Sequence, residues 1–357
     1  MRRAFGGNLN PDGVTLGADT ESRINYFQDP HHNKADGDGP NDRPEEEPTM
    51  DVVRQFGQVI LYGPPGTGKT REAKRAALAL LSGNKPPVEA SGNKPPVEAT
   101  AMEIEGQLRL FHELGRYEIV VFHPAYEYEQ FVGGIEPMVL DRQLAFQVRA
   151  GVFLRLCRYA ERSDQPAVLI IDEINRGSLP KLLGELVHAL EYRDHMVTLP
   201  FVCDGRSDLV VPHNLYIIAT MNSSDRSIGH IDVAIRRRFG LYHVGPEPNV
   251  VRSAWRSVRE SPDTDWPGSA TYDDQLARWM TDLNSSLGGE DPAAEVELGV
   301  GHSYFLPAPG STREEALRQV RMKWKYQVRP LLHQYAQVLN LGAEFFQRFR
   351  DLPAPPA

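Results

Sequence analysis

Short apolar runs alternate with amphipathic segments through the middle of the chain. Five of these runs have the length and composition of buried strands: 59–62, 118–122, 168–171, 215–219 and 241–244. Helical patterns such as the one over 71–81 separate them, and strands that are apolar at every position are buried on both faces of a sheet. The pattern therefore predicts an α/β fold, with a five-stranded parallel sheet between layers of helices.

The pattern changes on both sides of this region. Residues 1–50 contain ten acidic and five basic side chains and show no helical or strand period, so we expect a disordered acidic tail. Beyond residue 246 the strand signal fades and helical segments broken by Gly and Pro take over. The predicted organisation is a tail over 1–50, an α/β domain over 51–246, a smaller helical lid domain over 247–350 and a Pro-rich tail over 351–357.

A nine-residue segment is duplicated inside the predicted α/β domain. Residues 82–90 recur without change as 91–99. A repeat fold needs longer units and at least three of them, and these units contain Pro-Pro. We expect a tandem duplication in a surface loop over 82–99.

Composition narrows the class of protein. The 357 residues are 41% hydrophobic, which excludes a wholly disordered chain, and the net charge of -9 disfavours nucleic-acid binding by bulk charge. Cys157 and Cys203 are too few for a disulfide framework or a four-cysteine zinc site, so we expect both in the core of a protein from a reducing compartment. Because no apolar run approaches the roughly 18 residues of a membrane span, we expect a soluble, cytoplasmic protein.

A phosphate-binding loop follows the first apolar run. The matching residues of the pattern G-x-x-x-x-G-K-[ST] are Gly63, Pro64, Pro65, Gly66, Thr67, Gly68, Lys69 and Thr70. The strand before the loop and the helix after it are the context in which backbone N–H groups cradle a nucleotide's phosphates. Lys69 would contact the β- and γ-phosphates, and the Thr70 hydroxyl would bind Mg²⁺.

Two carboxylates end the apolar run at 168–171. Asp172 and Glu173 occupy the position called Walker B, at the carboxyl end of a buried strand. Placing two carboxylates there costs free energy unless the site uses them. Asp172 would hold Mg²⁺, and Glu173 would polarise the water that attacks the γ-phosphate.

Two further candidates lie downstream. Asn222 lies three positions beyond the run at 215–219. It would face the γ-phosphate if that strand lies between the phosphate-loop strand and the Asp-Glu strand. The cluster 236–238 consists of three arginines on a predicted helix. In a ring of P-loop subunits, such a position projects an arginine into the neighbour's nucleotide.

Taken in order, these motifs resemble the AAA+ superfamily, and more specifically its McrB family, the NTPase subunits of modification-dependent (type IV) restriction systems. The family signature Met-Asn-Thr-Ala-Asp-Arg-Ser is similar to residues 221–227, in which Ser223-Ser224 replaces Thr-Ala. The resemblance extends from about residue 58 to 335. It includes the segments 122–131, 171–177, 184–186, 232–239 and 301–305.

The resemblance implies several roles. Asn222 and Asp225 would help to order the attacking water, and Arg237 or Arg238 would act in trans across a hexameric ring. A McrC-like nuclease would be the partner that hydrolysis powers or licenses in restriction of modified or foreign DNA. Because only an acidic segment of fifty residues precedes the motor, in place of a recognition domain, we expect contact with DNA only through a partner. The sequence leaves the choice between ATP and GTP open.

Other interpretations remain open at this stage. One is a MoxR-like ATPase that remodels protein partners without DNA, which the signature at 221–227 disfavours. Another is a nucleotide-binding module without turnover, which the complete set of site residues disfavours. His302 or Ser303 would approach the nucleotide from the lid, or His302 would simply cap a helix, and His123 and Tyr126 carry no assigned chemistry.

Overall fold

The computed structural model describes residues 48–83, 101–140, 142–225, 231–259, 272–288 and 298–353. These residues all belong to one compact unit, residues 47–357. Most of the predicted acidic tail, nearly all of the duplicated loop, Arg226 and Ser227 of the signature, and residues 354–357 lie outside the described ranges.

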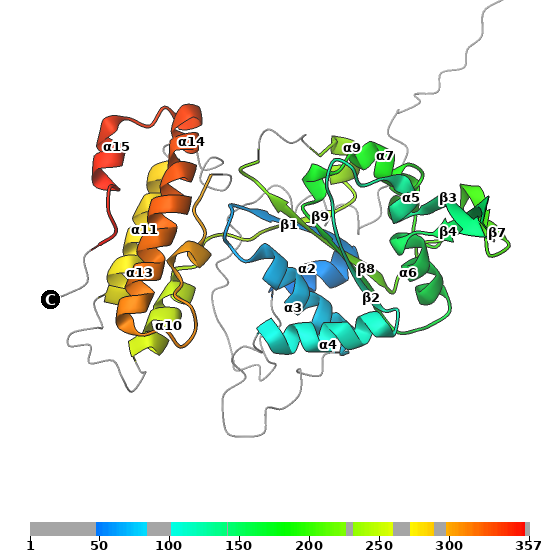
Figure 1. Cartoon of the computed structure of the whole chain (residues 1–357), viewed down its shortest axis with the longest axis horizontal. Coiled ribbons are helices and arrows are strands. Elements are labelled where there is room, and N and C mark those ends of the chain that lie inside the picture. Colours follow the sequence, from blue (N-terminus) through cyan, green and yellow to red (C-terminus); the bar gives the residue numbers. More distant parts are fainter. Residues whose placement is uncertain are drawn as a thin grey trace, which may run out of the picture. The chain divides into compact units, whose positions relative to one another are not determined.

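Five parallel strands form the central sheet, in the order β2, β5, β8, β1, β9 (Figure 1). Their bounds are Gln58–Gly63 (β1), Tyr117–Val121 (β2), Ala167–Asp172 (β5), Leu215–Asn222 (β8) and Gly240–His243 (β9). The predicted fold is confirmed, and β8 lies between β1 and β5. The register pairs Gly63 with Asn222, so the carboxyl ends of these strands meet at one edge of the sheet.

Alternate residues of each strand pack on opposite faces of the sheet. Val59 and Leu61 of β1 lie in one core, whereas Ile60 lies in the other. The first core is completed by α2 (Pro48–Phe56), α3 (Lys69–Leu81) and α4 (Ala101–Glu113), and the second by α6 (Val152–Glu161), α7 (Leu179–Leu183) and α8 (Leu186–Glu191). Burial on both faces explains the continuous apolar runs of β1, β5 and β8, whereas Ile119 and Val121 of β2 are exposed.

Two boundaries differ from the predictions. Helix α2 begins at Pro48 and buries Met50, a residue that the sequence pattern had assigned to the tail. Helix α9 covers only Val233–Arg236, so Arg237 and Arg238 follow this helix instead of lying on it. Cys157 and Cys203 are buried and free, as expected of core residues.

Two antiparallel hairpins were not predicted. Strand β3 (Gly133–Leu140) pairs with β4 (Gln143–Ala150), and β6 (Val197–Cys203) pairs with β7 (Arg206–Leu209). Residues of β4 are exposed or half-buried throughout, so no continuous apolar run marks this strand. The short helices α5 (Tyr128–Phe131) and η1 (Ile174–Arg176) complete the α/β part.

The helical part has its own hydrophobic core, which contains Trp255, Met280 and Trp324. Its elements are α10 (Pro248–Arg259), α11 (Tyr272–Gly288), η3 (His302–Phe305), α13 (Arg313–Lys323), the π-helical turn η4 (Trp324–Val328), α14 (Arg329–Leu339) and α15 (Ala343–Arg348) (Figure 1). Among the described helices of the chain, none has the length and apolar character needed to cross a membrane.

Candidate active site

The phosphate loop connects β1 to α3 at the carboxyl edge of the sheet. Gly66 and Gly68 adopt φ values of 80° and 82°, a left-handed conformation that favours glycine and allows the loop to curl. The Lys69 side chain is buried, and its Nζ donates to the carbonyl oxygens of Gly63 at 3.0 Å and Pro64 at 2.7 Å. The ammonium group is therefore held inside the loop, where a phosphate would bind.

The two predicted metal ligands are in direct contact. Thr70 Oγ1 donates a hydrogen bond to Asp172 Oδ1 at 2.9 Å, although the residues are 102 positions apart. A hydroxyl and a carboxylate are hard oxygen ligands, and Mg²⁺ in nucleotide sites usually takes one or two carboxylates together with phosphate oxygens. The pair fits Mg²⁺ in chemistry and in position.

Thr220, near the end of β8, holds both acids of the Walker B pair. Its hydroxyl donates to Asp172 Oδ1 and accepts from the backbone N–H of Glu173 at 3.2 Å. Glu173 itself has a φ of 57°, a left-handed conformation that is uncommon outside glycine and clusters at functional sites. The Thr220 hydroxyl thus fixes the backbone at the point where the chain turns out of β5.

Asn222, Glu173, Arg176 and Asp225 form a continuous polar cluster. Asn222 Nδ2 donates to Glu173 Oε1 at 2.6 Å, and Arg176 Nε donates to Glu173 Oε2 at 3.1 Å. The same guanidinium contacts Asp225 Oδ2 through a second nitrogen at 3.1 Å. Three predicted catalytic residues therefore lie together, joined by an arginine to which the sequence had given no role.

Burial and charge oppose each other at this site. Burial raises the pKa of Glu173, although the positive charge of Arg176 opposes this rise. Burial lowers the pKa of Lys69 to about 8, although the carboxylates of Glu173 and Asp172 favour its charged form. A cation and two acids thus share a poorly hydrated space, an arrangement common in catalytic sites.

The segment 301–305 of the helical part docks onto the phosphate loop. The backbone N–H of Gly301 donates to Pro65 O and that of Ser303 donates to Gly66 O, both at 3.0 Å. A Cβ on Gly301 would lie 2.0 Å from the Gly66 carbonyl carbon, so only glycine permits this approach. The lid therefore reaches the phosphate loop through main-chain groups.

His302, within this segment, contacts the chain just before α10. It is 9% exposed, and its Nδ1 accepts from the backbone N–H of Glu247 at 3.2 Å. Burial, together with the charge of Arg71, lowers the pKa of His302 to about 4. The imidazole is therefore neutral at pH 7, and its hydrogen bond ties the docked segment to the connection that precedes α10.

Arg237 and Arg238 lie outside the polar cluster around Glu173, and their side chains differ in exposure. Both face Glu191 at the end of α8, Arg237 at 3.8 Å and Arg238 in closer contact. The Arg237 side chain is 61% exposed, whereas that of Arg238 is 9% exposed. Of the two, Arg237 has the freedom to reach another molecule.

Thr220 and Arg176 are the site residues that sequence reasoning missed. Thr220 stands two positions before Asn222, and Arg176 stands three positions after Glu173. Arg176 lies inside the segment 171–177 and Thr220 directly precedes the signature at 221–227, so proximity to the motifs was an available signal. Their partners could be recognised only once the strands were paired.

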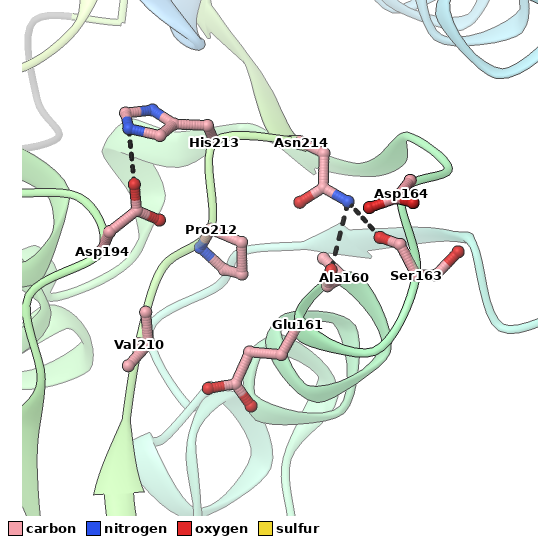
Figure 2. Close-up of a pocket in the computed structure, with 9 residues that line it drawn as sticks. All are labelled: Ala160, Glu161, Ser163, Asp164, Asp194, Val210, Pro212, His213 and Asn214. Carbon is pink, nitrogen blue, oxygen red and sulfur yellow. Dashed lines mark hydrogen bonds and ion pairs between the residues drawn. The ribbon is translucent and has the colours of Figure 1, made fainter.

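A surface groove of about 510 Å³ lies at the opposite edge of the sheet, at the amino ends of β5 and β8 (Figure 2). Its polar side chains bond to other groups of the same chain: Asn214 donates to the carbonyl oxygens of Ala160 and Ser163, and His213 contacts Asp194. The groove is separate from the phosphate loop, and these contacts pair its side chains with other groups of the chain.

Comparison with known proteins agrees with this geometry. The family model described as "AAA domain (dynein-related subfamily)" matches residues 101–239. The Escherichia coli K12 protein "Type IV methyl-directed restriction enzyme EcoKMcrB subunit" is 30% identical over 285 residues, which cover 78% of this chain and 53% of that protein. The Bacillus subtilis 168 protein "Type II restriction enzyme BsuMI component YdiS" is 24% identical over 234 residues, covering 55% of this chain and 60% of that protein.

The sheet order, the phosphate loop and the Walker B pair define an AAA+ NTPase. Within this class the chain is a McrB-like AAA+ protein, related to subunits of restriction enzymes. It spans about half the length of the McrB relative and three fifths of the YdiS relative.

Proposed function

We propose that this chain hydrolyses ATP or GTP with Mg²⁺ as a subunit of a ring. The ring would be the motor of a restriction system whose nuclease is a separate, McrC-like chain. The observation that carries hydrolysis is the convergence of the phosphate loop with both Walker B acids and Asn222. The similarity to two restriction-enzyme components supports the biological setting. DNA would be contacted through the partner.

The residues of the two Walker motifs and Asn222 have separate tasks in this proposal. Backbone N–H groups of the loop and Lys69 would bind the phosphates, and Thr70 and Asp172 would hold Mg²⁺, which neutralises phosphate charge when bound. Glu173 would accept a proton from the attacking water, and Asn222 would orient that carboxylate through the 2.6 Å hydrogen bond.

The ring supplies the remaining charge. Arg237 would act in trans on the nucleotide of the neighbouring subunit, because its side chain is exposed at the end of α9. Positive charge supplied in this way compensates the charge that develops during phosphoryl transfer. We propose a hexamer by analogy with ring-forming AAA+ proteins.

Steady-state phosphate release tests the proposal. The purified chain is assayed with Mg²⁺ and either ATP or GTP over a range of protein concentrations, and we expect specific activity to rise with concentration because sites are shared. Lys69→Ala should abolish nucleotide binding, and Glu173→Gln should bind nucleotide without turning it over. Turnover in Glu173→Gln equal to that of the unmutated chain would refute the catalytic assignment.

A further inference from the structure

Arg176 belongs to the polar cluster, but the catalytic proposal gives it no task. It ends the η1 turn directly after Glu173, and its backbone N–H donates to Glu173 O at 2.9 Å. This tight turn folds the arginine side chain back over the glutamate that precedes it by three residues. The side chain is 42% exposed, so the protein does not bury it for packing.

The guanidinium group of Arg176 spans two carboxylates. Nε contacts Glu173 and a terminal nitrogen contacts Asp225, each at 3.1 Å. Two carboxylates at this range repel each other, and each one disfavours ionisation of the other. A planar guanidinium has its donors in a fixed fork, so it sets the spacing of the acids as well as compensating their charge.

The hydrogen bonds among these residues form a closed ring of contacts. Asn222 bonds to Glu173, Arg176 bonds to Glu173 and Asp225, and the backbone N–H of Asp225 contacts Asn222 O at 3.5 Å. Both oxygens of the Glu173 carboxylate thus have donors, one from β8 and one from the η1 turn. Loss of the Arg176 contact would leave this carboxylate held from one side.

We propose that Arg176 is a positioning residue that acts in cis, holding the Glu173 carboxylate and Asp225 of its own subunit in the geometry required for attack on the γ-phosphate. This inference rests on the proposed hydrolysis. It separates Arg176 from Arg237, whose exposed side chain is proposed to serve the neighbouring subunit.

The first test compares two matched arginine variants. Arg176→Ala should lower kcat by roughly 10- to 100-fold, the range expected when a reacting group is misplaced by about an ångström, while KM, nucleotide Kd and the unfolding midpoint stay unchanged. Arg176→Lys should recover part of the loss, because an ammonium group can pair with one acid at a time. Arg75→Ala is the control, since Arg75 is also 42% exposed and also pairs with a glutamate three positions earlier; it should leave kcat unchanged.

The second test distinguishes action in cis from action in trans. Arg176→Ala chains are mixed with Glu173→Gln chains, which contain an intact Arg176 but no catalytic acid of their own. If Arg176 acts in cis, phosphate release stays at the level of the Arg176→Ala chains. Recovery in the mixture, an unchanged or raised kcat in Arg176→Ala, or a change confined to KM would overturn the inference. Absence of turnover in the unmutated chain would instead refute the proposed hydrolysis, and this inference with it.

Discussion

The contact between the lid and the phosphate loop leads to a prediction for Gly301→Ala. Gly301 has φ -69° and ψ 158°, which alanine adopts without strain, so the effect is purely steric. The new Cβ would lie 2.0 and 2.1 Å from the carbonyl carbon and oxygen of Gly66 and 2.4 Å from the nitrogen of Thr67. Since carbon contacts normally lie at about 3.5 Å or more, the segment must retreat by about 1.5 Å.

That retreat would break both hydrogen bonds between the segment and the loop. They measure 3.0 Å, so an additional 1.5 Å exceeds hydrogen-bonding range. Each bond contributes about 1 kcal/mol, and residual overpacking costs about 1–3 kcal/mol. We therefore expect Gly301→Ala to destabilise the docked lid by about 3–5 kcal/mol.

Urea unfolding followed by tryptophan fluorescence measures this loss, because Trp255, Trp279 and Trp324 all lie in the helical part. The matched control is Gly106→Ala, at an exposed position inside α4 where a Cβ would meet nothing within 4 Å. The control should gain about 1 kcal/mol from helix propensity. If Gly301→Ala unfolds at the same urea concentration as the unmutated chain, the close approach of lid and loop is wrong.

The remaining predictions concern individual side chains. Thr220→Val, which removes one hydroxyl of the site, should lower kcat by roughly 10- to 100-fold with unchanged nucleotide Kd. Thr220→Ser should restore turnover, and equal kcat values for the Val and Ser variants would refute the role of the hydroxyl. The pKa of His302 is about 4 in the folded state against 6.5 unfolded, so its contribution to the free energy of unfolding is complete above pH 6.5 and is lost as pH falls toward 4. Over this window the free energy of unfolding of His302→Asn should therefore decline less than that of the unmutated chain, by on the order of 3 kcal/mol. Parallel curves would contradict this. Arg238→Ala should lower the unfolding midpoint because it removes a largely buried side chain together with its ion pair to Glu191. Arg237→Ala should instead abolish turnover at an unchanged midpoint and regain it when mixed with Lys69→Ala chains; no recovery would count against a shared site.

The strands and the phosphate loop could be predicted because local sequence determines them. A strand between two helical layers must be apolar at nearly every position, and Val59, Ile60 and Leu61 are all fully buried. The meeting of Thr70 with Asp172 also followed, because carboxyl ends of parallel strands lie at one edge. These predictions needed the order of the motifs and no knowledge of distant contacts.

The parts that escaped prediction depend on tertiary contacts. Identical neighbours such as Arg237 and Arg238 cannot be told apart locally, yet one is 61% exposed and the other 9%. The docking of Gly301 joins segments more than two hundred residues apart, and no local pattern of apolar and polar residues indicates such a contact. The β3–β4 hairpin is mostly exposed, so burial left no regular pattern in its sequence.

The phosphate loop uses its hydrogen-bonding groups in two directions. Carbonyl oxygens of Pro65 and Gly66 accept from the lid, and those of Gly63 and Pro64 accept from Lys69. Phosphate oxygens are acceptors, so they compete for donors such as the loop N–H groups and the Lys69 ammonium group. A nucleotide would therefore draw Lys69 away from its two carbonyl partners without displacing the lid. Because the lid stays attached to the same loop that binds phosphate, any shift of the loop during turnover is carried directly into the helical part.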